Sequence, residues 1–188
     1  TIILNTDNIH YGIGDESIKD TAKILSEYAD IVMIRTSQHK KLEDFAKHSN
    51  IPVINGLSEQ SHPCQIMSDI LTFEEIKGNI KDKTIAWLGD GNNNMSNSFI
   101  EASAKFGFKF NIGCPDKYKP SKNMLVWAKK NKANITVTKN PGDAVKNADC
   151  VMTDKWVSMN DKVDKNKKKK MLKPYQVNKK IMKLAKSD

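Results

Sequence analysis

Short apolar runs alternate with segments of helical spacing along the 188 residues of the chain. The apolar runs end repeatedly at polar or glycine residues, which is typical of short buried strands. They predict strands over residues 2–4, 31–34, 51–54, 84–88, 108–112, 135–137 and 150–152. Helical spacing predicts helices over residues 15–29, 42–46, 63–76, 96–106, 121–132 and 141–147, followed by a loop and two further helices.

This alternation predicts an α/β fold, with parallel sheets covered by helices. A long predicted helix and a polar stretch separate two series of strands. We therefore expect two parallel-sheet α/β domains, residues 1–76 with the linking helix and residues 77–188. Parallel sheets bind ligands at the carboxyl ends of their strands. The candidate residues are the polar ones at those ends: Arg35, residues 55–61, residues 90–94 and Asp154.

The formal net charge of +9 and the pI of about 9.3 raise the question of a polyanionic partner. The lysines are spread along the chain, without interleaved aromatic residues, and the one dense run covers residues 165–170. We interpret them as a solvated surface and expect no nucleic-acid partner. A nucleic-acid binder using residues 165–170 is the alternative, and steep salt dependence of binding would identify it.

No apolar run reaches the ~20 residues that a membrane helix needs, and no apolar signal segment follows Thr1. The chain has three cysteines, an odd number, and no two lie close enough in sequence to suggest a metal or redox pair. We therefore expect free thiols and no metal site. We therefore expect a soluble cytoplasmic protein without a membrane partner.

Arg35 and a His-x-x-Gln element are the candidates in the first half of the chain. Arg35 is the only arginine among 31 basic residues, and a guanidinium can hold an oxyanion or carbonyl group in a way that lysine cannot. A surface ion pair would explain it equally well. His62 directly precedes a predicted helix, and Gln65 lies one turn later, so both could join the helix-start N–H groups around a planar amide. A histidine that only caps the helix is the alternative.

Three consecutive asparagines and an aspartate are the candidates in the second half. The asparagines, which include Asn93 and Asn94, follow a strand and a glycine-rich turn that lacks the third glycine of a dinucleotide loop. They offer neutral donors and acceptors suited to an amino-acid head group, although simple turn chemistry would also place them there. Asp154 ends a strand and could accept from an ammonium group, or it could cap a helix.

In order along the chain, these elements resemble the ornithine carbamoyltransferases of the aspartate/ornithine carbamoyltransferase family. Four motifs in unrelated loops carry the resemblance, which covers essentially the whole chain. They are Met33-Ile34-Arg35-Thr36, His62-Pro63-Cys64-Gln65, Gly89-Asp90-Gly91 leading to Asn93-Asn94-Met95, and Asp154-x-Trp156-x-Ser158-Met159. The last motif is the most specific, since relatives that act on aspartate or putrescine lack it in this form.

The resemblance implies an enzyme that transfers the carbamoyl group of carbamoyl phosphate to the δ-amine of L-ornithine. It assigns the carbamoyl group, and with it catalysis, to Arg35, His62 and Gln65. It assigns ornithine to a second set of residues: Asn93, Asn94, Asp154, Ser158 and Met159. It implies no metal, no cofactor and no covalent intermediate, and Cys64 is not expected to act as a nucleophile.

A complete family member also carries a Ser-x-Arg-Thr-Arg phosphate-binding motif and a later His-Cys-Leu-Pro motif, and neither occurs in this sequence. We therefore expect part of a longer parent that forms a homotrimer, with the first domain incomplete and the chain inactive by itself. A mitochondrial-matrix location is the alternative for a eukaryotic parent. Two other functions stay open: a carbamoyltransferase for another amine or amino acid, and a non-catalytic binding protein on the same scaffold.

Overall fold

The computed structural model describes residues 16–157 and 164–187, in two compact units, Thr1–Cys64 and Gln65–Asp188. The strand predicted over residues 2–4 lies outside the described residues. Every strand pair in both units is parallel, which confirms the α/β fold class. No helix in the described ranges is long and apolar enough to cross a membrane.

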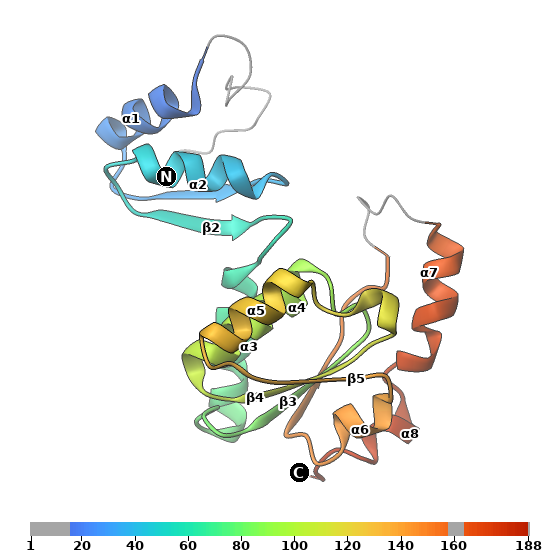
Figure 1. Ribbon diagram of the computed structural model, residues 1–188. Coiled ribbons are helices and arrows are strands. Elements are labelled where there is room, and N and C mark those ends of the chain that lie inside the picture. Colours follow the sequence, from blue (N-terminus) through green and yellow to red (C-terminus); the bar gives the residue numbers. More distant parts are fainter. Residues whose placement is uncertain (1–15, 158–163, 188) are drawn as a thin grey trace. The chain divides into compact units, whose positions relative to one another are not determined.

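The first unit contains a β-α-β arrangement preceded by a helix (Figure 1). Its elements are α1 (Ile18–Tyr28), β1 (Val32–Arg35), α2 (His39–His48) and β2 (Val53–Leu57). Ser17 caps α1 by accepting from the Asp20 N–H at 3.1 Å. Helices α1 and α2 pack together, with Ala22, Leu42 and Phe45 buried.

The two faces of β1 differ. Val32 and Ile34 are half-buried, whereas Met33 and Arg35 are exposed, because successive side chains of a strand point to opposite faces. Arg35 therefore lies on the open face of the β1–β2 sheet.

The second unit is built on a four-stranded sheet with the strand order β5-β4-β3-β6. Its strands are β3 (Thr84–Leu88), β4 (Lys109–Gly113), β5 (Asn134–Thr138) and β6 (Cys150–Met152). Its helices are α3 (Pro63–Lys77), which begins at the end of the first unit, α4 (Asn94–Phe106), α5 (Lys122–Lys130), α6 (Pro141–Val145), α7 (Lys165–Leu172) and α8 (Lys179–Met182), with 3₁₀ turns η1 (Asp116–Tyr118) and η2 (Lys173–Tyr175).

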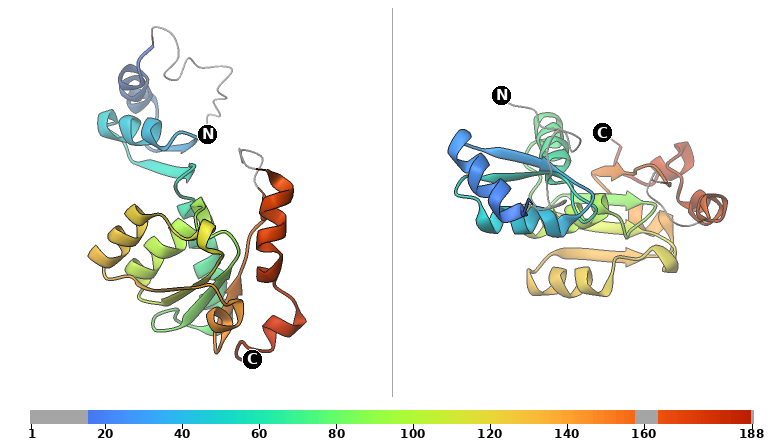
Figure 2. Two further views of the ribbon diagram at one scale, coloured as in Figure 1. Left: turned by 45° about the vertical axis from the view of Figure 1, so that its right-hand side comes forward. Right: turned by 90° about the horizontal axis from the view of Figure 1, so that it is seen from above.

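Alternate residues of β3 enter two cores, one on each face of the sheet. Ile85 and Trp87 pack with buried residues of α3, α4 and α5, whereas Ala86 and Leu88 pack with α6 and with Tyr175 of η2. Helices α7 and α8 lie beside the same sheet in each view (Figure 2). Strand β3 is therefore the buried centre of this unit, and its carboxyl end is held from both faces.

Most predicted elements are present with shifted ends, and the strands over 84–88 and 150–152 are confirmed residue for residue. Ser121 caps α5, as predicted. The end predicted for the strand over residues 51–54 is wrong, because β2 continues through Asn55 and Gly56 to Leu57. The short helix predicted over 42–46 extends over ten residues. The domain boundary at residue 76 stays a prediction. The compact units divide at Cys64, and the buried residues of α3 belong to the core of the second unit that also contains Ile85 and Trp87.

Candidate functional site

Arg35 ends β1 at an irregularity of the β1–β2 ladder. The parallel register shifts between Ile34, opposite Asn55, and Arg35, opposite Leu57. Gly56 lies between these partners, and a Cβ there would come within 3.0 Å of the Met33 side chain. Such bulges re-aim side chains beside functional sites. The Arg35 guanidinium has no hydrogen-bond or ion-pair partner among the described residues, so the alternative of a surface ion pair gains no support.

The loop before His62 turns around the hydroxyl of Ser58, a fully buried residue. The Ser58 Oγ accepts from the N–H groups of Gln60 at 3.3 Å and Ser61 at 3.1 Å. The same oxygen lies 2.8 Å from Nδ1 of His39, at the start of α2. The Ser58 N–H donates to the Ser61 carbonyl at 2.8 Å. This network fixes the path of the chain directly before His62.

Asn55 ties the end of β2 to the same loop. Its Nδ2 donates to the Ser61 Oγ at 2.9 Å, and its carbonyl accepts from the Cys64 Sγ at 3.3 Å. The Cys64 thiol therefore contacts the backbone of β2. Gln65, in the first turn of α3, donates from Nε2 to the Asp69 Oδ1 at 2.9 Å.

In the second unit, the loop after β3 depends on two glycines. Gly89 has φ +137°, a conformation that other residues rarely adopt. At Gly91, a Cβ would come within 2.9 Å of the Tyr118 carbonyl oxygen and 3.1 Å of the Cys114 sulfur. The Gly91 N–H donates to that Tyr118 carbonyl at 2.8 Å. These glycines serve the close packing of the strand end.

The asparagines after this loop start helix α4. The Asn93 Oδ1 accepts from the Ser96 N–H at 2.8 Å, so Asn93 is the N-cap of α4. Turn and cap chemistry thus accounts for its side-chain oxygen. Asn94 is the first helical residue and is half-buried. Both residues lie at the amino end of a 13-residue helix, where free N–H groups favour a carboxylate.

Asp154 follows β6, the strand next to β3. The Thr153 Oγ1 donates to the Leu88 carbonyl at 2.8 Å and so joins the ends of the two strands. Asp154 is exposed, and its Oδ1 accepts from the Lys155 N–H at 2.7 Å. The predicted site residues Ser158 and Met159 lie outside the described residues.

The strand order explains why these two loops come together. From β3 the chain moves through β4 to β5 on one side, and then returns to place β6 on the other side of β3. Ligands of open parallel sheets bind outside the carboxyl ends of the strands where the order reverses in this way. The structure therefore brings Asn93, Asn94 and Asp154 to neighbouring strand ends, although they are far apart in sequence.

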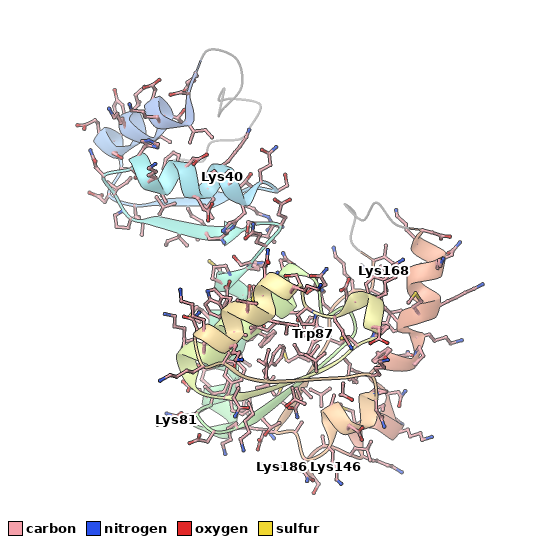
Figure 3. The ribbon with its side chains drawn as sticks, in the orientation of Figure 1. Lys40, Lys81, Trp87, Lys146, Lys168 and Lys186 are labelled. Atoms are coloured by element: carbon pink, nitrogen blue, oxygen red, sulfur yellow. The ribbon has the colours of Figure 1, made fainter. Side chains whose placement is uncertain are left out.

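One lysine of the basic run is buried, which corrects the interpretation of the whole run as solvated surface. Lys168 of α7 is 5% exposed, and its Nζ donates to the Asp90 Oδ2 at 2.7 Å (Figure 3 labels Lys168). Asp90 is 6% exposed and lies directly after Gly89. A buried ammonium needs a partner of opposite charge, so α7 is attached to the loop after β3. The other described lysines of the run are exposed.

Cys114 packs under the same loop, against the position of Gly91. Burial raises the pKa of its thiol to about 11, an effect that Lys119 opposes and Asp90 and Asp116 reinforce. The thiol is therefore neutral at physiological pH and acts as a small core residue. Among the described residues, no group of three or more His, Cys, Asp or Glu side chains could hold a metal ion.

Sequence reasoning selected the candidate residues but missed Ser58, which holds the loop before His62, and Lys168, which holds Asp90. Ser58 lay within a polar stretch that was singled out only as a whole, and Lys168 could not be distinguished from its lysine neighbours. The one available signal at Lys168 was helical periodicity. A lysine four residues before the apolar Leu172 lies on the same helix face.

Two family models together match nearly all of the chain. The carbamoyl-phosphate-binding domain of the aspartate/ornithine carbamoyltransferases matches residues 1–75, and their aspartate/ornithine-binding domain matches residues 81–188. The ornithine carbamoyltransferase of Rhodopseudomonas palustris is 49% identical over 188 residues, which are 100% of this chain and 60% of that protein. That of Rhizobium meliloti is 49% identical over 173 residues, 92% of this chain and 56% of that protein.

Solved structures give the same result. The ornithine carbamoyltransferase of Pyrococcus furiosus superimposes with a TM-score of 0.87 at 38% identity, covering 97% of this chain and 59% of that one. The anabolic enzyme of Campylobacter jejuni also gives 0.87, at 34% identity, covering 97% of this chain and 61% of that one. The chain thus spans about three-fifths of the length of these relatives.

Proposed function

Because the chain belongs to the aspartate/ornithine carbamoyltransferase family, we propose that it carries substrate-binding residues of an ornithine carbamoyltransferase. The reaction moves the carbamoyl group of carbamoyl phosphate to the δ-amine of L-ornithine and yields L-citrulline and phosphate. The observation that carries the proposal is the pairing of strand-end loops in the second unit. Asn94 after β3 and Asp154 after β6 lie at adjacent strand ends, where an amino-acid head group would bind.

In the first unit, Arg35 and His62 donate to the carbonyl oxygen of the carbamoyl group. The neutral δ-amine attacks the carbamoyl carbon, negative charge builds on this oxygen, and phosphate then leaves. Donors aimed in advance at that charge are usually the largest catalytic contribution, and loss of one costs about 3 kcal/mol. At the start of α3, Gln65 accepts from the carbamoyl amino group through Oε1, the amide atom that is not used in the bond to Asp69. The open face of β1 makes the Arg35 guanidinium accessible for this role.

In the second unit, the ornithine head group binds between the two loops. The α-carboxylate lies at the amino end of α4, beside Asn94 and the cap residue Asn93, where the helix N–H groups favour negative charge. The α-ammonium is held by Asp154, whose exposed carboxylate is the charge at the end of β6. Ser158 and Met159 complete this half-site. The parent protein is proposed to be a cytoplasmic homotrimer, by analogy with the family.

The test is citrulline formation by the parent protein, expressed from its complete reading frame, with putrescine and aspartate as parallel acceptors. Carbamoylated product formed with ornithine alone supports the proposal. Carbamoylated product formed with putrescine or aspartate contradicts the assignment of the Asp154 loop. Arg35→Lys should lower kcat by roughly 100-fold or more, because an ammonium cannot reproduce the planar donor pair. Asp154→Asn should instead raise the KM for ornithine and leave that for carbamoyl phosphate unchanged.

The 188-residue chain by itself is proposed to be inactive, because its sequence does not include the Ser-x-Arg-Thr-Arg motif that binds phosphate in the family. Assaying the purified chain beside the parent tests this point separately. Turnover of the isolated chain at the rate of the parent would refute it. The competing function, a non-catalytic binding protein on the same scaffold, would give no product with any acceptor from the parent either.

A further inference from the structure

We propose that Lys168 is a positioning residue for the ornithine half-site and acts through its buried ion pair with Asp90. The inference rests on the proposed function and adds to it a residue that touches no substrate. Lys168 lies in α7, after the Asp154 segment, and Asp90 lies in the loop after β3. One ion pair thus joins the loop that leads to Asn93 and Asn94 with the helix that follows the Asp154 segment along the chain.

The burial of Lys168 sets it apart within a helix of lysines. Lys167 and Lys169, its neighbours in α7, are exposed, whereas only 6% of the Lys168 side chain is exposed. Removing an ammonium from water costs several kcal/mol, and a carboxylate at hydrogen-bond distance offsets that cost. Helix α7 therefore has one preferred position on the second unit, the one in which Lys168 reaches Asp90.

The Asp90 carboxylate connects α7 to the loop that precedes α4. Its Oδ2 accepts from the Lys168 Nζ at 2.7 Å, and its Oδ1 accepts from the Asn92 N–H at 2.8 Å. Asn93 and Asn94 follow at once. A carboxylate held on both oxygens cannot rotate without breaking a bond, so the backbone that leads to these asparagines is fixed by the lysine.

Tyr118 contacts both the loop after β3 and the Lys168 ammonium. Its carbonyl accepts from the Gly91 N–H at 2.8 Å, and the Lys168 Nζ lies 5.3 Å from the centroid of its ring. A cation at this distance from an aromatic face is attracted to it. Lys168, Asp90 and Tyr118 thus form a small buried cluster. Each member contacts the loop between β3 and α4 or is part of it.

The same ion pair attaches α7, the helix that follows Asp154 along the chain. Asp154 is held close to β3 through Thr153, whose hydroxyl donates to the Leu88 carbonyl. Helix α7 is the next described element, and Lys168 attaches it to Asp90. Thr153 on one side and α7 on the other are therefore both attached near the carboxyl end of β3. Without Lys168 the Asp90 carboxylate loses one of its two hydrogen-bond partners, and ornithine must order the loop that leads to Asn94 when it binds, which lowers its affinity.

The experiment uses the complete parent protein with three variants: Lys168→Met, Lys168→Arg, and Lys169→Met as the matched control on the exposed side of α7. Lys168→Met should raise the KM for ornithine roughly tenfold and leave the KM for carbamoyl phosphate within twofold of wild type. Lys168→Arg keeps the charge and should restore most of the ornithine affinity. Lys169→Met should behave as wild type.

Two kinetic outcomes overturn the inference. The first is an unchanged KM for ornithine in Lys168→Met; the second is an equal change for both substrates, which indicates general damage to the fold. Amide hydrogen exchange separates these from failure of the proposed function. Even if the parent makes no citrulline, Lys168→Met should speed exchange at Asn92–Asn94 and at 155–157, while Lys169→Met should not. Unchanged exchange at both segments would show that the pair positions neither loop.

Discussion

Replacing Ser58 with alanine removes one hydroxyl from the loop that presents His62. This hydroxyl accepts from two backbone N–H groups and contacts the His39 ring. Gln60 is exposed, so water can replace the hydroxyl at its N–H, whereas Ser61 is buried at 7% exposure and its N–H would lose its acceptor. The variant therefore leaves the buried Ser61 N–H without its acceptor and removes the hydrogen-bond partner of the His39 Nδ1.

The magnitude follows from this count of contacts. A buried donor without a partner costs about 1–3 kcal/mol. The free energy of local opening at residues 58–62 should fall by that amount, and the Ser61 amide should exchange roughly 5- to 150-fold faster. The backbone bond from the Ser58 N–H to the Ser61 carbonyl remains, so the loop should loosen without unfolding of the unit.

Hydrogen exchange of the 188-residue chain, followed by NMR at the Ser61 amide, measures this change. Ser187→Ala is the matched control, because Ser187 is exposed and makes no side-chain hydrogen bond with a described residue. In the parent, Ser58→Ala should also lower kcat, since His62 would be less well placed for the carbamoyl oxygen. Exchange at Ser61 equal to that of the Ser187→Ala control would refute the role assigned to the Ser58 hydroxyl.

Three further predictions concern the second unit. Burial alone would raise the pKa of Asp149, but hydrogen bonds from Lys186 and the Thr84 N–H lower it overall. The stabilisation that the ionised Asp149 provides is thus fully present above its unfolded pKa of 3.8 and is lost as pH falls through the lowered pKa. Asp149→Asn should therefore make the urea midpoint of unfolding depend less on pH in the acid range. Cys114, 0% exposed, should resist iodoacetamide at pH 8, as read by mass spectrometry, and rapid native-state labelling would contradict its burial. Gly91→Ala should cost about 1–3 kcal/mol in urea unfolding, because the new Cβ meets a backbone carbonyl, and an unchanged midpoint would exclude that clash.

The alternation of apolar and polar positions determined the fold class and most of the elements. Apolar runs as short as Thr84–Leu88 were predictable because a strand buried on both faces is apolar at nearly every position. Strand β2 was harder to predict. Asn55 and Gly56 are residue types typical of turns. The strand continues through them because its pairing with β1 continues, with Asn55 opposite Ile34 and Leu57 opposite Arg35.

The sequence also contains the residue types that the proposed chemistry would use. A single arginine at a strand end, a histidine before a helix and an aspartate after a strand were recognisable because their positions relative to local elements are set by neighbouring residues. Their resemblance to one family supplied the roles, and the family models confirmed the membership.

Only the tertiary structure decided which residues support the site. Strand order brings Asp154 next to the loop after β3, and no local pattern encodes that order. Among consecutive lysines of equal helix propensity, tertiary packing alone buries Lys168 against Asp90. Local sequence sets which side chains a helix or strand presents; the partner that each side chain meets depends on contacts between distant segments, and these form only when the whole unit has packed.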